Sequence, residues 1–297
     1  MPAPTASDRA ARAVVVTGAT RGIGRAVVEG LTARLPEVWV WLGARDAQRG
    51  EAVRGQLLAA RPEAEGRLAV LPLDVADEDS VAAAASLLER AGGPPLWGIV
   101  NNAGVADGNL QAVLEVNVRG IDRVCRRLGR FLGPGGRVVN VSSAAGPNYV
   151  ARCPPRWRRF FTDPALARPE FEALVTDCLR GGPEALRARG LPWPGAYGFS
   201  KALANALTAI LAREHPEWRV AACTPGFVDT ELGRRFLGGR SPAEAGMKTP
   251  AQGAEVILYL LTAPGIASGG YYGSDGRPSP LDRYREPGPP VWKEAAG

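Results

Sequence analysis

Short apolar runs alternate along the chain with longer segments in which apolar residues recur at helical spacing. Strands are predicted over residues 13–18, 38–43, 67–74, 96–102, 136–143 and 218–226, and helices over 22–34, 46–60, 77–90 and 197–213. This alternation predicts an α/β protein with a doubly wound, mostly parallel sheet, a Rossmann fold, because parallel neighbours need crossover connections. Ligands of such sheets bind at the carboxyl ends of the strands.

Two segments depart from this rhythm within a single domain expected over residues 1–297. Residues 144–196 are predicted to form a helical insertion, and one helical face within it is expected to carry Phe171, Leu174, Val175, Cys178 and Leu179. The tail, 276–297, is rich in proline and is expected to run extended over the surface.

Composition narrows the classes of function. The net charge is +6, but basic and acidic residues are interspersed, which argues against a nucleic-acid partner; the run RWRRFF at 156–161 is the one local exception. No apolar run is long enough for a membrane span, and the first residues lack a secretion signal, so a cytoplasmic location is expected. The only histidine is His215 and the four cysteines form no CxxC pair, so no metal site is expected.

A glycine-rich turn follows the first predicted strand and opens the first predicted helix. In VVVTGATRGIG, Gly18, Gly22 and Gly24 let the backbone approach a pyrophosphate, which the helix N-terminus attracts. The alternative is a tight turn without a ligand.

The end of the second predicted strand indicates which dinucleotide would bind. A carboxylate there accepts hydrogen bonds from the ribose of NAD, whereas the 2′-phosphate of NADP needs cationic donors. This chain has Ala44 and then Arg45, and Arg21 in the glycine turn can reach the same phosphate. NADP is therefore favoured, although Asp46 would oppose a phosphate unless it serves as the N-cap of the next helix.

Tyr197 and Lys201 are four residues apart in a predicted helix, so both side chains lie on one face. A neighbouring ammonium is expected to lower the pKa of a phenol, so that the phenol can exchange its proton near neutral pH. Of the 36 basic residues only Lys201, Lys248 and Lys293 are lysine, which suggests that position 201 needs a compact cation with three rotatable donors. The alternative is an ordinary helix with a packed tyrosine and a solvated lysine.

The sequence resembles the short-chain dehydrogenases/reductases. The resemblance rests on motifs that occur in the right order between residues 13 and about 265: TGATRGIG (17–24), LDV (73–75), NNAG (101–104), EVNVRG (115–120), GRVVNVSS (136–143), YGFSK (197–201) and TPGFVDT (224–230).

The resemblance implies a role for each matching residue. Ser143 and Tyr197 would bind a substrate carbonyl, Lys201 would tune Tyr197, and Asn117 would hold a water that relays protons. The residues implied at the cofactor, beyond Lys201 and Tyr197, are Gly18, Arg21, Gly22, Ile23, Gly24, Arg45, Asp74, Val75, Asn102, Ala103, Gly104, Pro225, Gly226, Val228 and Thr230.

Within the family, the 54-residue gap between Ser143 and Tyr197 is similar to that of the monomeric NADPH-dependent carbonyl reductases. That likeness implies a monomer whose insertion covers a surface used elsewhere for assembly; the alternative is a lid or loop unrelated to assembly. Two departures alter the substrate pocket: the segment between NNAG and Asn117 is short, and Phe227 stands where the animal enzymes tend to have Trp.

The expected activity is reduction of a ketone or aldehyde, in which NADPH delivers a hydride to the carbonyl carbon, the pro-S hydride as the resemblance implies, and Tyr197 donates the proton. Two alternatives remain: a catalytically silent NADP-sensing or scaffold protein, and an enone C=C reductase. The substrate itself is not readable from the sequence.

Overall fold

The computed structural model describes residues 11–293. The start of the chain, on which the expectation about a secretion signal rests, and the last four residues of the predicted tail lie outside the described residues. Within them no helix is long and apolar enough to cross a membrane.

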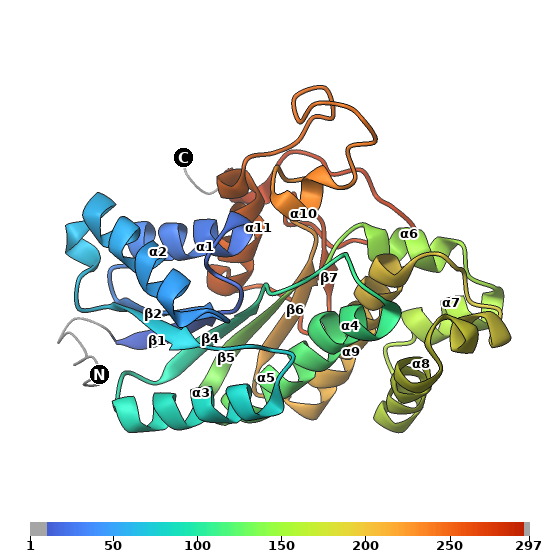
Figure 1. Ribbon diagram of the computed structural model, residues 1–297, viewed down its shortest axis with the longest axis horizontal. Helices are drawn as coiled ribbons and strands as arrows, with labels where there is room; N and C mark the ends of the chain where they lie inside the picture. The colour runs from blue at the N-terminus through green and yellow to red at the C-terminus, as the bar shows by residue number, and fades with distance from the viewer. Residues whose placement is uncertain (1–10, 294–297) are drawn as a thin grey trace.

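A seven-stranded parallel sheet forms the centre of the molecule, with the strand order β3-β2-β1-β4-β5-β6-β7 (Figure 1). The strands are β1 Arg12–Val16, β2 Val38–Ala44, β3 Leu68–Pro72, β4 Leu96–Asn101, β5 Leu132–Val141, β6 Arg219–Cys223 and β7 Tyr271–Tyr272. The predicted Rossmann architecture is confirmed. The strand β7 was missed, because two residues are too few to make a periodic pattern.

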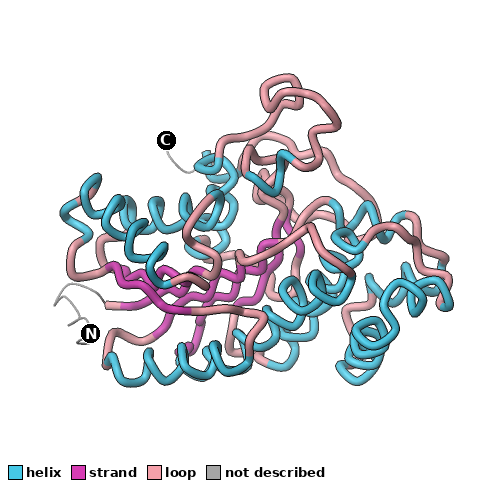
Figure 2. Tube along the Cα trace, in the orientation of Figure 1, coloured by secondary structure: helices cyan, strands magenta, loops and turns pink. Residues whose placement is uncertain are grey.

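Helices cover both faces of the sheet (Figures 1 and 2). The helices on one face are α1 Gly22–Arg34, α2 Ala47–Ala60 and α11 Pro250–Thr262, and those on the other are α3 Glu78–Ala91, α4 Leu110–Leu114, α5 Gly120–Leu128 and α9 Ala196–Glu214. Alternate residues of β2 serve the two cores: Trp39 and Trp41 pack on the α3–α9 side, while Val40 and Leu42 pack on the α1–α11 side.

The segment between β5 and α9 holds three helices beside α9 (Figure 1). They are α6 Ala145–Ala151, α7 Pro155–Thr162 and α8 Arg168–Ala188, the last interrupted at Gly182. The predicted apolar face of α8 is confirmed, since Phe171, Leu174, Val175 and Cys178 are buried and Leu179 packs against the same core.

The tail after β7 has no α-helix within the described residues and ends there in a 3-10 turn, Val291–Lys293. The Asp275 carboxylate, which is fully buried, ties this segment to the sheet edge. It accepts hydrogen bonds from Arg285 Nη2 at 2.6 Å and from the Gly288 N–H at 2.8 Å.

Candidate active site

The glycine turn is held against the end of β4 by the NNAG motif. Gly18 has φ +62°, and a Cβ there would lie 2.9 Å from the Cα of Ala103. Asn102 Nδ2 donates to the carbonyls of Thr17 at 2.9 Å and Gly18 at 3.1 Å, and a Cβ on Gly24 would clash with the same nitrogen. Asn102 and Ala103, expected to line a cofactor, therefore also fix the shape of the turn.

The N-terminus of α1 keeps its N–H groups available to an anion. Its N-cap residue, Arg21, makes no side-chain capping bond, and the first turn contains no acidic residue. By contrast, α2 and α3 are capped by Asp46 and Asp77. An uncapped, 13-residue helix behind a glycine turn fits a pyrophosphate, because the positive end of the helix attracts its charge.

Cationic side chains lie at the end of β2. Arg45 and Arg49 are exposed, and within residues 11–293 neither belongs to an ion pair. The Asp46 carboxylate accepts the Arg49 N–H at 3.0 Å, which confirms that Asp46 is an N-cap. Arg49 was not predicted from the sequence, although its place in the first turn of the helix after Arg45 could have indicated it. The donors here fit a phosphate better than a ribose hydroxyl.

Arg21, expected to reach the same phosphate, forms an exposed ion pair with Glu231 at the start of α10 Glu231–Arg234. Thr230 caps α10 and lies against the glycine turn, since a Cβ on Gly22 would be 3.1 Å from its Cγ2. Val228 is buried near Ile23, both within 3.5 Å of a Cβ built on Gly253.

Residues from two distant elements meet at the carboxyl end of β5. Ser143 follows β5, and Tyr197 and Lys201 come from the first turns of α9. The Ser143 hydroxyl is hydrogen-bonded to the Tyr197 phenol. Lys201 is buried, and its Nζ donates to the carbonyl of Val141 at 2.8 Å and lies 5.6 Å from the centroid of the Tyr197 ring. The predicted serine, tyrosine and lysine are thus brought together.

The electrostatics of this group differ from the expectation. Burial raises the pKa of the Tyr197 phenol above its ordinary value, and the hydrogen bond with Ser143 only partly offsets this. Burial lowers the pKa of Lys201 to about 8. The expected lowering of the Tyr197 pKa by Lys201 is therefore wrong for this arrangement, because the ammonium donates to Val141 and lies beside the ring.

Asn117 lies in a π-helical turn, Glu115–Arg119, a local irregularity often found at functional sites. Its Oδ1 accepts the N–H of Val105 at 2.9 Å, and its Nδ2 donates to Ser200 Oγ at 2.9 Å. A Cβ on Gly104 would lie 3.3 Å from Asn117 Oδ1 and 3.5 Å from Lys201 Nζ. Gly104 therefore leaves room beside the lysine, whereas a water held by Asn117 stays a prediction.

The other predicted cofactor residues lie at neighbouring strand ends. Asp74 and Val75 follow β3, and the Asp74 carboxylate accepts the N–H of Ala76 at 3.0 Å. Pro225 and Gly226 follow β6. All of them lie at the carboxyl ends of the strands, as the glycine turn does.

Lys248 lies near Gly226, and the sequence did not predict it as part of the site. Its Nζ donates to Ser274 Oγ at 2.9 Å, and a Cβ on Gly226 would lie 3.3 Å from the Lys248 Cδ. No sequence motif marks Lys248 apart from the rarity of lysine in this chain.

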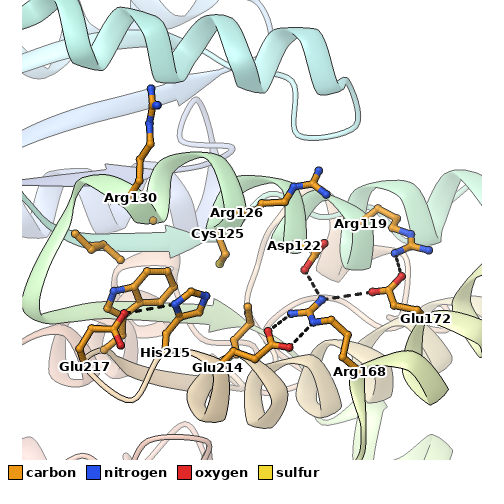
Figure 3. A pocket seen from close by; sticks show the side chains of 14 residues that line it. Arg119, Asp122, Cys125, Arg126, Arg130, Arg168, Glu172, Glu214, His215 and Glu217 are labelled. Atoms are coloured by element: carbon orange, nitrogen blue, oxygen red, sulfur yellow. Dashed lines mark hydrogen bonds and ion pairs between the residues drawn. The ribbon is translucent and has the colours of Figure 1, made fainter.

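A cavity of about 760 Å³ lies away from this group, between α5, the end of α9 and the start of α8 (Figure 3). Arg168 crosses it, pairing with Asp122 at 2.7 Å and with Glu214 at 2.6 Å, so it links α8 to α5 and α9. His215 stacks on Trp218 with ring centroids 3.7 Å apart. None of the predicted catalytic residues lines this cavity, and its charges are largely compensated.

Sequence comparisons identify relatives of the chain. A family profile described as short chain dehydrogenase matches residues 12–155. Carbonyl reductase (NADPH) 1 of Sus scrofa is 32% identical over 274 residues, covering 87% of this chain and 89% of that protein. Carbonyl reductase (NADPH) 3 of Mus musculus is 33% identical over 270 residues, covering 85% and 91%.

The chain belongs to the short-chain dehydrogenase/reductase family. The resemblance seen in its motifs is thereby confirmed, and the protein is an oxidoreductase of that family.

Solved structures share the fold. Salutaridine reductase from Papaver somniferum superimposes with a TM-score of 0.74 at 25% identity, covering 88% of this chain and 99% of that one. Menthone neomenthol reductase from Mentha piperita gives a TM-score of 0.71 at 24% identity, covering 89% and 98%.

Proposed function

We propose that this short-chain dehydrogenase/reductase uses NADPH to reduce ketones or aldehydes to alcohols, with Tyr197 as the proton donor. The observation that carries the proposal is the contact of the Ser143 hydroxyl with the Tyr197 phenol, beside buried Lys201. Two hydroxyl groups that meet at the carboxyl ends of the strands can both donate hydrogen bonds to one carbonyl oxygen.

NADPH as the cofactor is supported by charge and by the relatives. Arg45 and Arg49 supply exposed cations at the end of β2, and Asp46 is turned back as an N-cap. The names of the pig and mouse relatives specify NADPH. The glycine turn and the uncapped α1 would hold the pyrophosphate, and Arg45 and Arg49 would hold the 2′-phosphate.

Bound NADPH would supply the hydride for the carbonyl carbon. Tyr197 would donate its phenolic proton to the carbonyl oxygen, which becomes the hydroxyl of the product. The raised pKa of Tyr197 keeps that proton in place at neutral pH, so the phenol is in the form that reduction requires. Ser143 would donate a hydrogen bond to the oxygen as negative charge develops there, a kind of stabilisation that typically contributes about 3 kcal/mol.

Lys201 would restore the proton to Tyr197 and orient the cofactor. Its ammonium has three donors, and one of them is committed to Val141. The remaining donors are available to ribose hydroxyls and to a proton path that passes Gly104 and Asn117. A compact ammonium suits this crowded, buried position better than a guanidinium.

Product analysis tests the proposal against its alternatives. Purified protein is incubated with NADPH and an α,β-unsaturated aldehyde, and the products are separated. We expect NADPH oxidation with the unsaturated alcohol as product. A saturated aldehyde would show C=C reduction instead, and NADPH binding without consumption across a panel of carbonyls would indicate a sensing protein.

The monomeric state and the cytoplasmic location expected from the sequence stay predictions. The helices α6–α8 pack beside α9, which supports a monomer in which they cover this side of the molecule. Sedimentation at micromolar concentration would test it.

A further inference from the structure

The connection between the NNAG motif and α4 is short, and it is paired with a segment that follows β6. Only residues 105–109 separate Gly104 from α4. Opposite them stands the α10 segment, which we define as residues 231–237. It lies above the carboxyl ends of β6 and β7 (Figure 1).

Two ion pairs connect the α10 segment to two other loops of the site. Arg235 pairs with Asp107 in the short connection, and Glu231 pairs with Arg21 in the glycine turn. All four side chains are at least 45% exposed, so the pairs are open to solvent and sensitive to salt. They hold the segment between these two loops without burying it in the core.

The α10 segment carries an aromatic ring onto the catalytic tyrosine. The centroids of Phe236 and Tyr197 lie 5.5 Å apart, with their planes inclined by 34°. Phe236 is 49% exposed, and within the described residues the one other large apolar side chain with such exposure is Tyr284 at 53%. Phe236 therefore offers an open apolar face directly beside the phenol that would donate the proton.

We propose that Phe236 determines substrate specificity by favouring aldehydes and ketones that carry an aryl group next to the carbonyl. The inference rests on the proposed function. A carbonyl oxygen that reaches both Ser143 and Tyr197 brings its substituent close to the ring of Phe236. A flat aryl group gains offset stacking and burial there, whereas a small aliphatic group covers little of the ring.

Asp107 and Arg235 are positioning residues in this scheme. Their ion pair sets where Phe236 lies relative to Tyr197. In this scheme the α10 segment covers the part of the substrate site that the short 105–109 connection leaves uncovered.

The first test compares Phe236→Ala with wild type in NADPH-dependent reduction of benzaldehyde and of propanal. We expect the KM for benzaldehyde to rise about tenfold, with kcat and the KM for propanal changed less than about twofold. Tyr284→Ala, which removes the other exposed ring, is the matched control and should change neither KM. Thermal unfolding and NADPH affinity, measured in parallel, should match wild type because Phe236 is on the surface.

The outcomes separate this inference from the proposed function. An active wild type whose ratio of KM values is unmoved in Phe236→Ala contradicts the inference alone, as does an equal change in Tyr284→Ala. A wild type that oxidises NADPH with neither aldehyde overturns the proposed function, and the inference falls with it.

The second test uses salt to probe the positioning pair. In wild type the KM for benzaldehyde should rise between 0.05 and 0.5 M NaCl, because screening weakens the Asp107–Arg235 pair. In Asp107→Asn the KM should already be raised and should depend less on salt. Asp282→Asn, which breaks an exposed pair with Arg283 in the tail, should behave like wild type. An unchanged salt dependence in Asp107→Asn would contradict the positioning role.

Discussion

The ammonium of Lys201 lies 5.6 Å from the centroid of the Tyr197 ring, one turn along α9, and donates its hydrogen bond to Val141 rather than to the phenol. Both groups are governed first by burial, which disfavours the charged form of each. The pair therefore consists of a phenol that keeps its proton and a lysine that gives up its own more readily than usual.

This pair predicts an alkaline limit to carbonyl reduction. The pKa of Lys201 is lowered to about 8, so its charge is lost as the pH rises through about 8, while Tyr197, whose pKa is raised, stays protonated. We expect kcat/KM to fall across this range, as measured from pH 6 to 10. In Lys201→Arg the remaining activity should lack this fall, because a guanidinium stays charged. A flat wild-type profile from pH 7 to 9.5 would contradict the assignment.

Lys201 should also cost stability at neutral pH. A cation whose pKa is lower in the folded than in the unfolded state binds its proton less well after folding, so stability rises as the pH increases from about 8 towards 10.5. Lys201→Met removes a penalty of at most about 3 kcal/mol at pH 7 and should raise Tm by a few degrees. Calorimetry checks this, and the gain should shrink near pH 10.5. A lower Tm in the variant at pH 7 would speak against a buried, strained cation.

The arginines at the end of β2 should determine the choice of dinucleotide. Replacing Arg45 and Arg49 with Gln removes two cationic donors from the proposed 2′-phosphate site. We expect the Kd for NADPH to rise about 10- to 100-fold, with that for NADH changed less than about threefold. Fluorescence titration measures both, and Arg90→Gln, an exposed arginine on α3, serves as the control. Equal losses for the two nucleotides would place the phosphate elsewhere.

The ion pair between buried Asp275 and half-buried Arg285 should hold the tail to the sheet. Burial alone would raise the pKa of Asp275, but hydrogen bonds from Arg285 and two backbone N–H groups outweigh it and lower the pKa to about 2. Its contribution to stability is present above about pH 4 and is lost as the pH falls towards 2.

Arg285→Met leaves the Asp275 carboxylate buried without its cation and should destabilise the protein by about 3 kcal/mol, as measured by urea unfolding at pH 7. Arg283→Met, in the exposed pair with Asp282, should cost less than about 0.5 kcal/mol. If the two variants unfold alike, the tail is not held by the Asp275–Arg285 pair.

Much of the site could be predicted from the sequence because it depends on local order. A glycine turn between a strand and a helix places Gly18 and Gly24, and four-residue spacing places Tyr197 and Lys201 on one face of α9. Parallel topology then brings Ser143 to the same edge from 54 residues away.

The rest depends on contacts that no local pattern encodes. The contact of the Phe236 ring with Tyr197 and the pair Asp107–Arg235 join segments that are far apart in the sequence. The sequence predicts a lowered pKa for Tyr197 from the charge of Lys201. The structure shows that burial, which both groups share, is the larger effect and raises the pKa of Tyr197. Burial depends on how all the segments at the carboxyl ends of the strands pack together. It could therefore not be predicted from two residues in one helix.

The most direct test of the account is single-turnover reduction of benzaldehyde by enzyme preloaded with NADPH, comparing wild type with Tyr197→Phe. Tyr259→Phe, a tyrosine on α11 outside the site, is the matched control. We predict that Tyr197→Phe still binds NADPH but oxidises it about 100- to 10,000-fold more slowly, while Tyr259→Phe behaves as wild type. Reduction by Tyr197→Phe at the wild-type rate would contradict the assignment of Tyr197 as the proton donor.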